Sequence, residues 1–338
     1  MLKIGIIGCG EWGLNFVRVF NQLTNSIVLW CADILQERID YVTNLYPMVK
    51  ATNDYKTILD SPEIDAVCIA TPASTHYEIT KSALLANKHT LVEKPLALNI
   101  KEAKELVDLS KSKNKILMVG HTFLFNMCVR KLKEYITQGE LGEIYYLYLT
   151  RVNLGPIRED VDAITDLIPH DLSIILYLLD QMPLYVNAKG KSYISNEKLD
   201  VGFVTLEFDN KVMANVHVSW IGPCKIRQIT IIGSEKMVIF DDTNLIEPIK
   251  IYNKSAYYKK RYDNYGEFQL VLRDGDIIIP KIELKEPLKN ECAHFIECIL
   301  EDKTPLSDGE NGVMVAKILE MIYESLKRNG NGARIDEV

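Results

Sequence analysis

The first third of the chain alternates between short apolar runs and longer segments in which apolar residues recur every three or four positions. Short continuous runs are typical of buried parallel strands, and the longer spacing is typical of helices packed on one side. The pattern predicts strands at 3–7, 27–32, 66–70, 89–92 and 116–119, with helices near 13–23, 35–45, 54–60, 76–86 and 99–113. This alternation predicts a doubly wound parallel sheet.

The pattern changes after residue 120. Segments near 143–153 and 184–253 alternate apolar and polar residues, which indicates a sheet with one covered and one partly open face, and Asp209-Asn210 predicts a hairpin turn. Helical patterns return at 166–179, 289–301 and 311–328, the last ended by Gly330. We therefore predict an α/β fold: a Rossmann domain over 1–120, and an α+β domain with a largely antiparallel, open-faced sheet over 121–338.

Three glycines follow the first predicted strand at GxGxxG spacing, namely Gly8, Gly10 and Gly13. Glycines at this spacing let the backbone approach a pyrophosphate at the start of a helix. The second predicted strand leads into Asp33, a carboxylate placed to accept hydrogen bonds from an adenosine ribose and to repel a 2′-phosphate. The pattern predicts a dinucleotide site that prefers NAD. Arg38 would blunt this preference, stack on adenine or remain solvated.

The charge and composition exclude several classes of partner. A formal net charge of −7 argues against general affinity for nucleic acid, and no apolar run reaches membrane-spanning length. The N-terminus enters a strand pattern at once, so we expect no signal peptide and a cytoplasmic protein. The seven cysteines show no CxxC spacing, which favours a reducing compartment. Cys292, His294 and Cys298 lie in a helical pattern, so we interpret them as packing residues and predict no metal.

A charged tripeptide, Glu93-Lys94-Pro95, closes the fourth predicted strand. The carboxyl edge of an open α/β sheet is where ligands bind, and a lysine there can hydrogen-bond a substrate hydroxyl or help to deprotonate it. The alternative is a structural lysine paired with Glu93. An X-Pro bond at the end of a strand is also a candidate for the cis form, which we expect for Lys94-Pro95.

A second group of polar residues occurs in the segment Asp166-Leu167-Ile168-Pro169-His170. If Pro169 lies in the first turn of a helix, Asp166 becomes its N-cap, and positions four apart then share one face. A carboxylate beside an imidazole fixes its orientation, which makes His170 a candidate general acid or base. The alternative is a capping aspartate and a structural histidine.

The stretch from Asp65 to Pro72, His76 and Glu93-Lys94-Pro95 resembles the Gfo/Idh/MocA oxidoreductase family, and the resemblance continues through 139–144 and 303–309. It spans essentially the full chain. The resemblance implies that Lys94 contacts the reacting hydroxyl and the nicotinamide ribose.

The same family carries an Asp-x-x-x-His pair that faces the nicotinamide, and Asp166 and His170 match it. Many relatives have glycines between the pair, whereas this chain has Leu167-Ile168-Pro169, so the local backbone is expected to differ. The implied reaction removes the hydroxyl proton of a secondary alcohol to His170, assisted by Lys94, while the carbinol hydrogen leaves as hydride to NAD.

Further residues complete the predicted site. His76 either lines the path of the nicotinamide ribose or is a surface residue at a helix start. Arg151 and Asn153 alternate on one strand face and either contact the substrate or have an exposed structural role. We expect NAD to be bound by Gly8, Gly10, Glu11, Trp12, Gly13, Asp33, Arg38, Thr71, Pro72, His76, Glu93 and Lys94, and the substrate by Lys94, His121, Arg151, Asn153 and His170.

The segments 120–123, 153–156 and 169–172 resemble the branch of the family that acts on nucleotide-linked amino sugars, such as UDP-N-acetylglucosamine 3-dehydrogenases. We expect an NAD-dependent dehydrogenase of such a sugar. The alternatives are a free sugar or inositol dehydrogenase, a redox-assisted glycoside hydrolase and a non-enzymatic NAD-binding regulator. The run 257–262 is either a base-stacking segment or a solvated hairpin tip. The open sheet face predicts a homo-oligomer, a dimer or tetramer.

Overall fold

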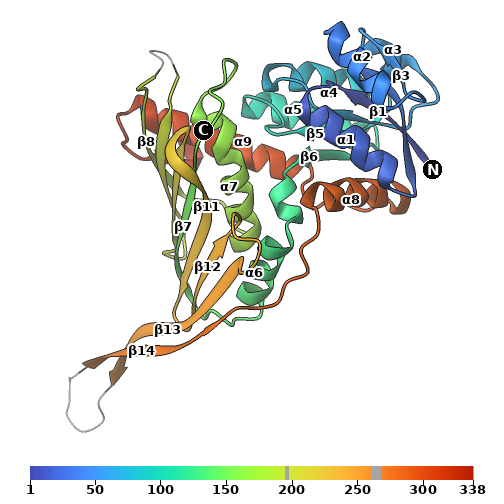
Figure 1. Cartoon of the computed structure of the whole chain (residues 1–338). Coiled ribbons are helices and arrows are strands. Elements are labelled where there is room, and N and C mark those ends of the chain that lie inside the picture. The colour runs from blue at the N-terminus through green and yellow to red at the C-terminus, as the bar shows by residue number, and fades with distance from the viewer. Residues whose placement is uncertain (195–197, 261–267, 338) are drawn as a thin grey trace. The chain divides into compact units, whose positions relative to one another are not determined.

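The computed structural model describes residues 1–194, 198–260 and 268–337 (Figure 1). The chain divides into two compact units. Unit 1 comprises Met1–Asn126 and Lys285–Glu320, and unit 2 comprises Met127–Leu284 and Met321–Val338.

Unit 1 is built on a parallel sheet with the strand order β3-β2-β1-β4-β5-β6, the order of a dinucleotide-binding Rossmann fold. The structure confirms the predicted strands, and it adds β3, which is too short for its pattern to predict. The strands are β1 (Leu2–Ile7), β2 (Ser26–Ala32), β3 (Lys50–Thr52), β4 (Ala66–Ile69), β5 (His89–Glu93) and β6 (Leu117–Gly120).

Helices follow the strands of unit 1 as the pattern predicts. Asn99 caps α5 by accepting the backbone N–H of Glu102 at 2.9 Å. The helices are α1 (Glu11–Gln22), α2 (Gln36–Leu45), α3 (Lys56–Asp60), α4 (His76–Leu85), α5 (Ile100–Ser112) and α8 (Pro287–Glu301), with short 3₁₀ turns η1 (Ala73–Thr75) and η2 (Thr122–Phe125).

The segment 285–320 belongs to unit 1, although the sequence pattern places it in the second domain. Helix α8 packs against α1 and η2, and the ring of Phe295 meets the edge of Phe20 with centroids 6.5 Å apart. Val313 and Ala316 join the core around β5 and β6. The sequence shows that these helices have an apolar face, but it does not show which elements that face packs against.

Unit 2 is built on a mixed sheet with the order β14-β13-β12-β11-β7-β10-β9-β8-β15, in which β7 and β10 are parallel and the other neighbours are antiparallel. β13 and β14 form a long hairpin (Figure 1). The strands are β7 (Ile144–Leu154), β8 (Tyr185–Lys191), β9 (Val201–Glu207), β10 (Met213–Ser219), β11 (Ile221–Gly233), β12 (Met237–Asp241), β13 (Ile249–Lys260), β14 (Phe268–Ile278) and β15 (Ala333–Arg334).

One face of this sheet is covered, as predicted, and the other is open. Helix α7 (Ala163–Leu179) packs on β7, β9 and β10, and α6 (Met127–Thr137), which we did not predict, packs beside α7. The open face carries the exposed side chains of Tyr146, Tyr148, Phe203 and Met213. The remaining elements are α9 (Gly309–Lys327) and η3 (Ile335–Glu337). In the described part of the chain, no helix has the length and apolar character of a membrane span.

Candidate functional site

The glycine loop of unit 1 has no room for side chains at two positions. Gly8 has φ of +92°, and a Cβ there would lie 2.6 Å from the carbonyl oxygen of Ala70. A Cβ on Gly13 would lie 1.9 Å from the carbonyl oxygen of Gly8, so only glycine lets α1 start this close to β1. Gly10 is the N-cap of α1 and supplies no capping side chain. The first N–H groups of the helix are thus placed to receive a pyrophosphate.

Asp33 is buried at the end of β2 and organises this loop. Its Oδ2 accepts the backbone N–H of Cys9 at 2.8 Å, and its Oδ1 accepts that of Leu35 at 2.9 Å. The half-exposed guanidinium of Arg38 donates to Oδ2 at 3.3 Å. A carboxylate has about four acceptor positions, so room remains for a ribose hydroxyl. The link from Asp33 to the glycine loop was not predicted, because spacing does not show which N–H a carboxylate meets.

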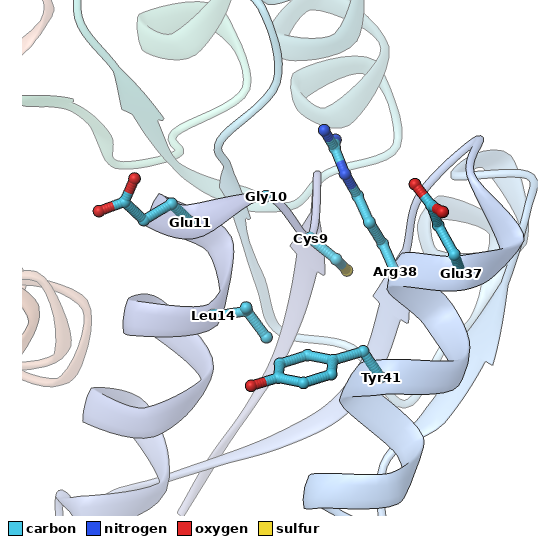
Figure 2. A pocket seen from close by; sticks show the side chains of 7 residues that line it. All are labelled: Cys9, Gly10, Glu11, Leu14, Glu37, Arg38 and Tyr41. Carbon is cyan, nitrogen blue, oxygen red and sulfur yellow. The ribbon is translucent and has the colours of Figure 1, made fainter. Parts of the chain in front are cut away.

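A pocket of about 350 Å³ lies beside the glycine loop, between α1 and α2 (Figure 2). Leu14 and Tyr41 contribute apolar surface, and Glu37 and Arg38 contribute charge. A pocket with both kinds of surface suits the adenosine half of NAD. Glu37 and Tyr41 were not predicted, although their spacing places them on one face of α2. The lining residues are Cys9, Gly10, Glu11, Leu14, Glu37, Arg38 and Tyr41.

We expect Asp33→Ser to raise the Kd for NADH by about 10-fold to 100-fold, because it removes a charged acceptor and releases the N–H of Cys9. The Kd for NADPH should rise less, since a repulsive charge also disappears. Fluorescence titration of both cofactors measures the two values. Asp40→Ser, an exposed change on α2 that lies outside the pocket lining, is the matched control. An unchanged ratio of the two Kd values would contradict the role of Asp33.

The Lys94-Pro95 peptide bond is cis, as predicted. Glu93 precedes it at the end of β5 and is buried, and its Oε2 accepts the backbone N–H of Lys94 at 3.2 Å. Across the sheet, Glu93 pairs with Gly120, and a Cβ on Gly120 would lie 3.2 Å from Glu93 Oε1. The absence of a side chain at Gly120 therefore leaves space for the Glu93 carboxyl group. This group accepts the backbone N–H of Lys94 at the start of the Glu93-Lys94-Pro95 turn.

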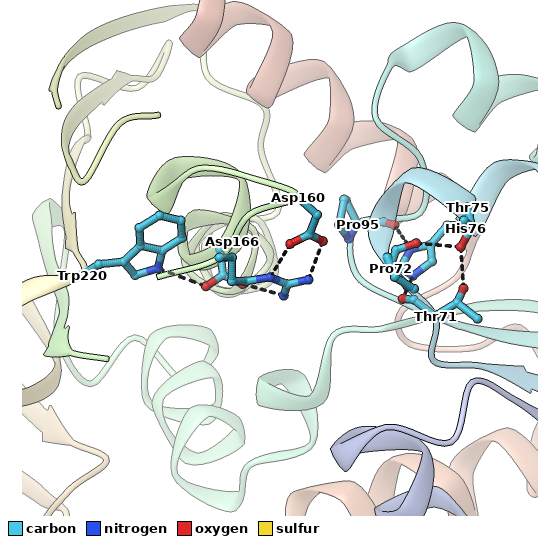
Figure 3. Close-up of polar contacts among 9 residues, drawn as sticks. Thr71, Pro72, Thr75, His76, Pro95, Asp160, Asp166 and Trp220 are labelled. Carbon is cyan, nitrogen blue, oxygen red and sulfur yellow. Dashed lines mark hydrogen bonds and ion pairs between the residues drawn. The ribbon is translucent and has the colours of Figure 1, made fainter. Parts of the chain in front are cut away.

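His76 begins α4 but is buried, so it is not the surface residue that we gave as an alternative. Its Nδ1 lies 2.7 Å from the carbonyl oxygen of Pro95, and its Nε2 lies 2.9 Å from that of Thr71 (Figure 3). Both partners are acceptors, so the ring can donate to both only as an imidazolium. His76 thus joins the loops that follow β4 and β5. In the first of these loops, Thr75 Oγ1 donates to Thr71 Oγ1 at 2.7 Å.

His121 follows β6 and is also buried. Burial, and then the charge of Lys94, lower the pKa of its imidazole to about 3, so the ring is neutral at physiological pH. The fully buried Glu291, from α8, belongs to the same region, because its Oε2 accepts the hydroxyl of Thr122 at 2.9 Å. We did not predict Glu291. A glutamate between the apolar residues Leu288 and Phe295 on a buried helix face was the available signal.

In unit 2, the N-cap of α7 lies four residues before the N-cap that we predicted. Asp162 is the N-cap and accepts the N–H of Thr165 at 2.8 Å, so the assignment of Asp166 as N-cap was wrong. Pro169 lies inside the helix, not in its first turn. A proline there removes one backbone hydrogen bond. The buried apolar residues on α7, including Ile168 and Leu172, offset this cost.

Asp166 is held by residues that the sequence did not indicate. Its Oδ1 accepts from Arg158 at 3.1 Å, and its Oδ2 accepts from Trp220 Nε1 at 3.2 Å (Figure 3). Arg158 also pairs with Asp160 at 2.7 Å. His170 lies four positions after Asp166 on α7 and is half-buried, so the two residues share one face of the helix. Direct orientation of the imidazole by Asp166 remains a prediction.

Arg151 is buried on the face of β7 that α7 covers. Its Nε and Nη2 donate to the two carboxylate oxygens of Asp171 at 3.0 and 2.8 Å. Asn153 lies near the end of the same strand and is exposed. The bidentate pair neutralises the charge of Arg151, which favours a structural role for this residue. Because Arg151 is buried, the exposed position that we gave in that alternative was wrong. Asn153 remains a predicted substrate contact.

We expect Arg151→Met to lower the free energy of unfolding by about 3 kcal/mol, because the buried Asp171 loses its partner. The double variant Arg151→Met/Asp171→Leu should regain most of this loss. Denaturant titration measures both. Lys254→Met, which breaks an exposed pair with Asp274, should cost less than about 1 kcal/mol. Equal losses in the single and double variants would contradict the pairing.

Two further predictions concern the group Cys292, His294 and Cys298 and the run 257–262. His294 Nε2 accepts the N–H of Leu306 at 2.9 Å and contacts Cys298 Sγ at 3.4 Å, which supports the packing interpretation of these residues. Of the run 257–262, Arg261 and Tyr262 lie outside the described residues, while the backbone of 257–260 is part of β13.

One family match lies in unit 1 and a second lies in unit 2. Residues 2–121 match the GFO/IDH/MocA oxidoreductase family with an NAD-binding Rossmann fold, and residues 129–239 match the C-terminal domain of that family. The chain is 26% identical to myo-inositol 2-dehydrogenase of Thermotoga maritima, covering 100% of this chain and 99% of that protein. It is 26% identical to UDP-N-acetylglucosamine 3-dehydrogenase of Acidithiobacillus ferrooxidans, over 75% and 78% of the two chains.

Two solved structures show the same fold. The structure of the Acidithiobacillus ferrooxidans UDP-N-acetylglucosamine 3-dehydrogenase has a TM-score of 0.78 at 24% identity, covering 97% of this chain and 98% of that one. The WlbA dehydrogenase of Bordetella pertussis, in complex with NADH and UDP-GlcNAcA, has a TM-score of 0.80 at 19% identity, covering 98% of each chain.

Proposed function

Because the chain belongs to the Gfo/Idh/MocA family of NAD-binding oxidoreductases, we propose that it transfers hydride between a secondary alcohol of a sugar and NAD, with Lys94 and His170 at the reacting carbon. One observation carries this proposal. Lys94 follows β5 at the carboxyl edge of the sheet that also holds the glycine loop, and Glu93 fixes its backbone. Ligands of open α/β sheets bind at this edge.

The residues of the chain divide the work of the reaction. Bound NAD supplies the acceptor for the hydride. Lys94 donates a hydrogen bond to the substrate oxygen and stabilises the charge that develops on it, and His170 accepts the hydroxyl proton. Asp166, itself held by Arg158 and Trp220, fixes the face of α7 that presents His170. The proposal requires Lys94 and His170 to reach the same carbinol when substrate is bound.

We propose a nucleotide-linked amino sugar as the substrate. The segments 120–123, 153–156 and 169–172 support this choice, together with the similarity to a UDP-N-acetylglucosamine 3-dehydrogenase. The second candidate is inositol or another free polyol, which the full-length similarity to a myo-inositol 2-dehydrogenase favours.

A substrate panel tests the proposal. NAD reduction is followed with UDP-N-acetylglucosamine, other UDP- and dTDP-linked sugars, myo-inositol and free sugars. We expect reduction with a nucleotide sugar, and a rise in melting temperature with UDP alone. Reduction with free polyols only would select the second candidate. Sugar release without net NADH would indicate a redox-assisted hydrolase, and binding of NAD without any turnover would indicate a regulator.

We further propose a homo-oligomer, a dimer or tetramer, formed through the open sheet face of unit 2, and a location in the reducing cytoplasm. Tyr146, Tyr148, Phe203 and Met213 give this face an exposed apolar surface. Each of the cysteines, all of which lie in the described residues, is a free thiol. Light scattering of the purified protein tests the oligomer, and a monomer would contradict it.

A further inference from the structure

A buried carboxyl group that the proposed reaction does not use lies near the Glu93-Lys94-Pro95 turn. Glu291 is 0% exposed and projects from α8. Its Oε2 accepts the hydroxyl of Thr122 at 2.9 Å, whereas its Oε1 has no hydrogen-bond partner among the described residues. Burying an ionised carboxylate with one hydrogen bond is costly, so this group needs a physical explanation.

The neighbour that matters most is Glu93. Its carboxyl group lies against Gly120, which β5 and β6 place opposite it, and Thr122 follows two residues later. The side chains of Glu93 and Glu291 therefore meet the same short segment, residues 120–122, from two different elements. Through Oε2, Glu93 also holds the backbone N–H of Lys94.

Two buried carboxyl groups in one region cannot both be ionised at low cost. Burial, and then the negative charge of Glu93, raise the pKa of Glu291 well above its ordinary value, against a smaller opposing effect of the Thr122 hydrogen bond. Burial also raises the pKa of the nearby thiols Cys68 and Cys292, so these remain neutral. The other charged or titratable groups of the surroundings are Lys94, His121, Glu286 and Arg18.

We propose that Glu291 is a positioning residue for Lys94: as a neutral acid it donates a hydrogen bond to the Glu93 carboxylate, and the singly charged pair fixes the start of the Glu93-Lys94-Pro95 turn. The acid accepts from Thr122 through one oxygen and donates through the other, so both of its oxygens are used. The positioning role rests on the proposed function of Lys94. The neutral state of Glu291 does not.

The pH dependence of stability tests the neutral state without any substrate. An acid whose pKa is higher in the folded chain than in the unfolded chain contributes stability that is fully present below the unfolded value, near 4.5, and is lost as pH rises toward the folded value. Glutamine has no proton to lose. The melting temperature of Glu291→Gln minus that of the wild type should therefore increase between pH 5 and pH 8, by on the order of 2 °C per pH unit.

Glu286 offers a matched control at the start of the same helix. It pairs with Arg18, and this hydrogen bond lowers its pKa, so its contribution has the opposite sign. Glu286→Gln should lose a small amount of stability at neutral pH and recover toward pH 4. A melting difference between Glu291→Gln and the wild type that stays flat or falls as pH rises would overturn the proposal, because Glu291 would then be ionised in the folded chain.

Kinetics test the positioning role. Glu291→Gln keeps a neutral side chain that donates and accepts, so kcat should stay within about threefold of the wild type. Glu291→Leu cannot form either bond, and kcat should fall about 10-fold to 100-fold while the KM for NAD changes little. Thr122→Val, which removes only the donor to Glu291, should give a smaller loss and serves if the leucine variant does not fold.

The remaining outcomes separate the two proposals. Full kcat in both Glu291→Leu and Thr122→Val would overturn the positioning role. A loss in Glu291→Gln as large as that in Glu291→Leu would overturn it as well, since the charge would then be what matters. If none of the sugars in the panel supports NAD reduction by the wild type, the proposed function and the positioning role fail together. The melting series still decides whether Glu291 is neutral.

Discussion

Lys94→Ala is expected to lower kcat about 10³-fold, close to 4 kcal/mol of transition-state stabilisation, while the Kd for NADH stays within about threefold. The reason is that Lys94 follows β5 at the ligand edge of the sheet, whereas the glycine loop and the pocket beside it are formed by other residues. In the proposed reaction, Lys94 stabilises the negative charge that develops on the substrate oxygen. Initial rates and fluorescence titration measure the two quantities.

Lys81→Ala is the matched control for this variant. Lys81 is a lysine of the same unit, on α4, and pairs with Glu105 on the surface. Its replacement should leave kcat within about twofold. If Lys94→Ala retains more than a tenth of the wild-type kcat, Lys94 is a structural residue and the alternative stated from the sequence is correct.

His170→Ala is expected to lower kcat about 10²-fold to 10³-fold, the usual contribution of a general acid or base. Tyr177→Phe, on the same helix, controls for general effects on α7 and should leave kcat within about twofold. Cofactor affinity should again change little.

The double variant Lys94→Ala/His170→Ala tests whether the two residues act on one reacting group. When two residues act as a unit, their losses of kcat do not multiply. The kcat of the double variant should therefore lie within about tenfold of that of the less active single variant. Losses that multiply fully would mean that the two residues act at separate steps or sites, and the proposed reaction would have to be rejected.

Much of unit 1 was predictable because its rules are local. A buried parallel strand needs a continuous apolar run, and a phosphate-binding turn needs glycines at fixed spacing. These rules placed β1, β2, β4, β5 and β6 and put Asp33 and Lys94 at the ends of strands. They did not place β3, because a short edge strand has too few residues to show a pattern.

The start of α7 could not be predicted with the same security. Asp162 and Asp166 are both suitable caps, and a proline is most easily accommodated in a first turn, which favoured the later one. The structure uses Asp162, and Pro169 sits in the helix interior, because burial of the apolar residues of α7 outweighs one lost hydrogen bond. Local preference gave way to tertiary packing.

The partners of the candidate site residues depend on contacts between distant parts of the chain. Trp220, from the junction of β10 and β11, donates to Asp166, and Glu291 from α8 is bound to Thr122. No spacing rule connects such positions. The unusual feature that the sequence does offer is a charged residue on an otherwise apolar face, as at Glu291.

Because residues 285–320 belong to unit 1, a truncated fragment of the chain that contains only the first part of this unit is incomplete. A fragment that stops at residue 126 has the whole parallel sheet but lacks α8, so the apolar surface of α1 around Phe20 would face water. Ser307, which donates to the carbonyl oxygen of Val119 at 2.7 Å, would be missing as well. A recombinant cofactor-binding fragment therefore has to fuse residues 1–126 to 285–320 through a linker.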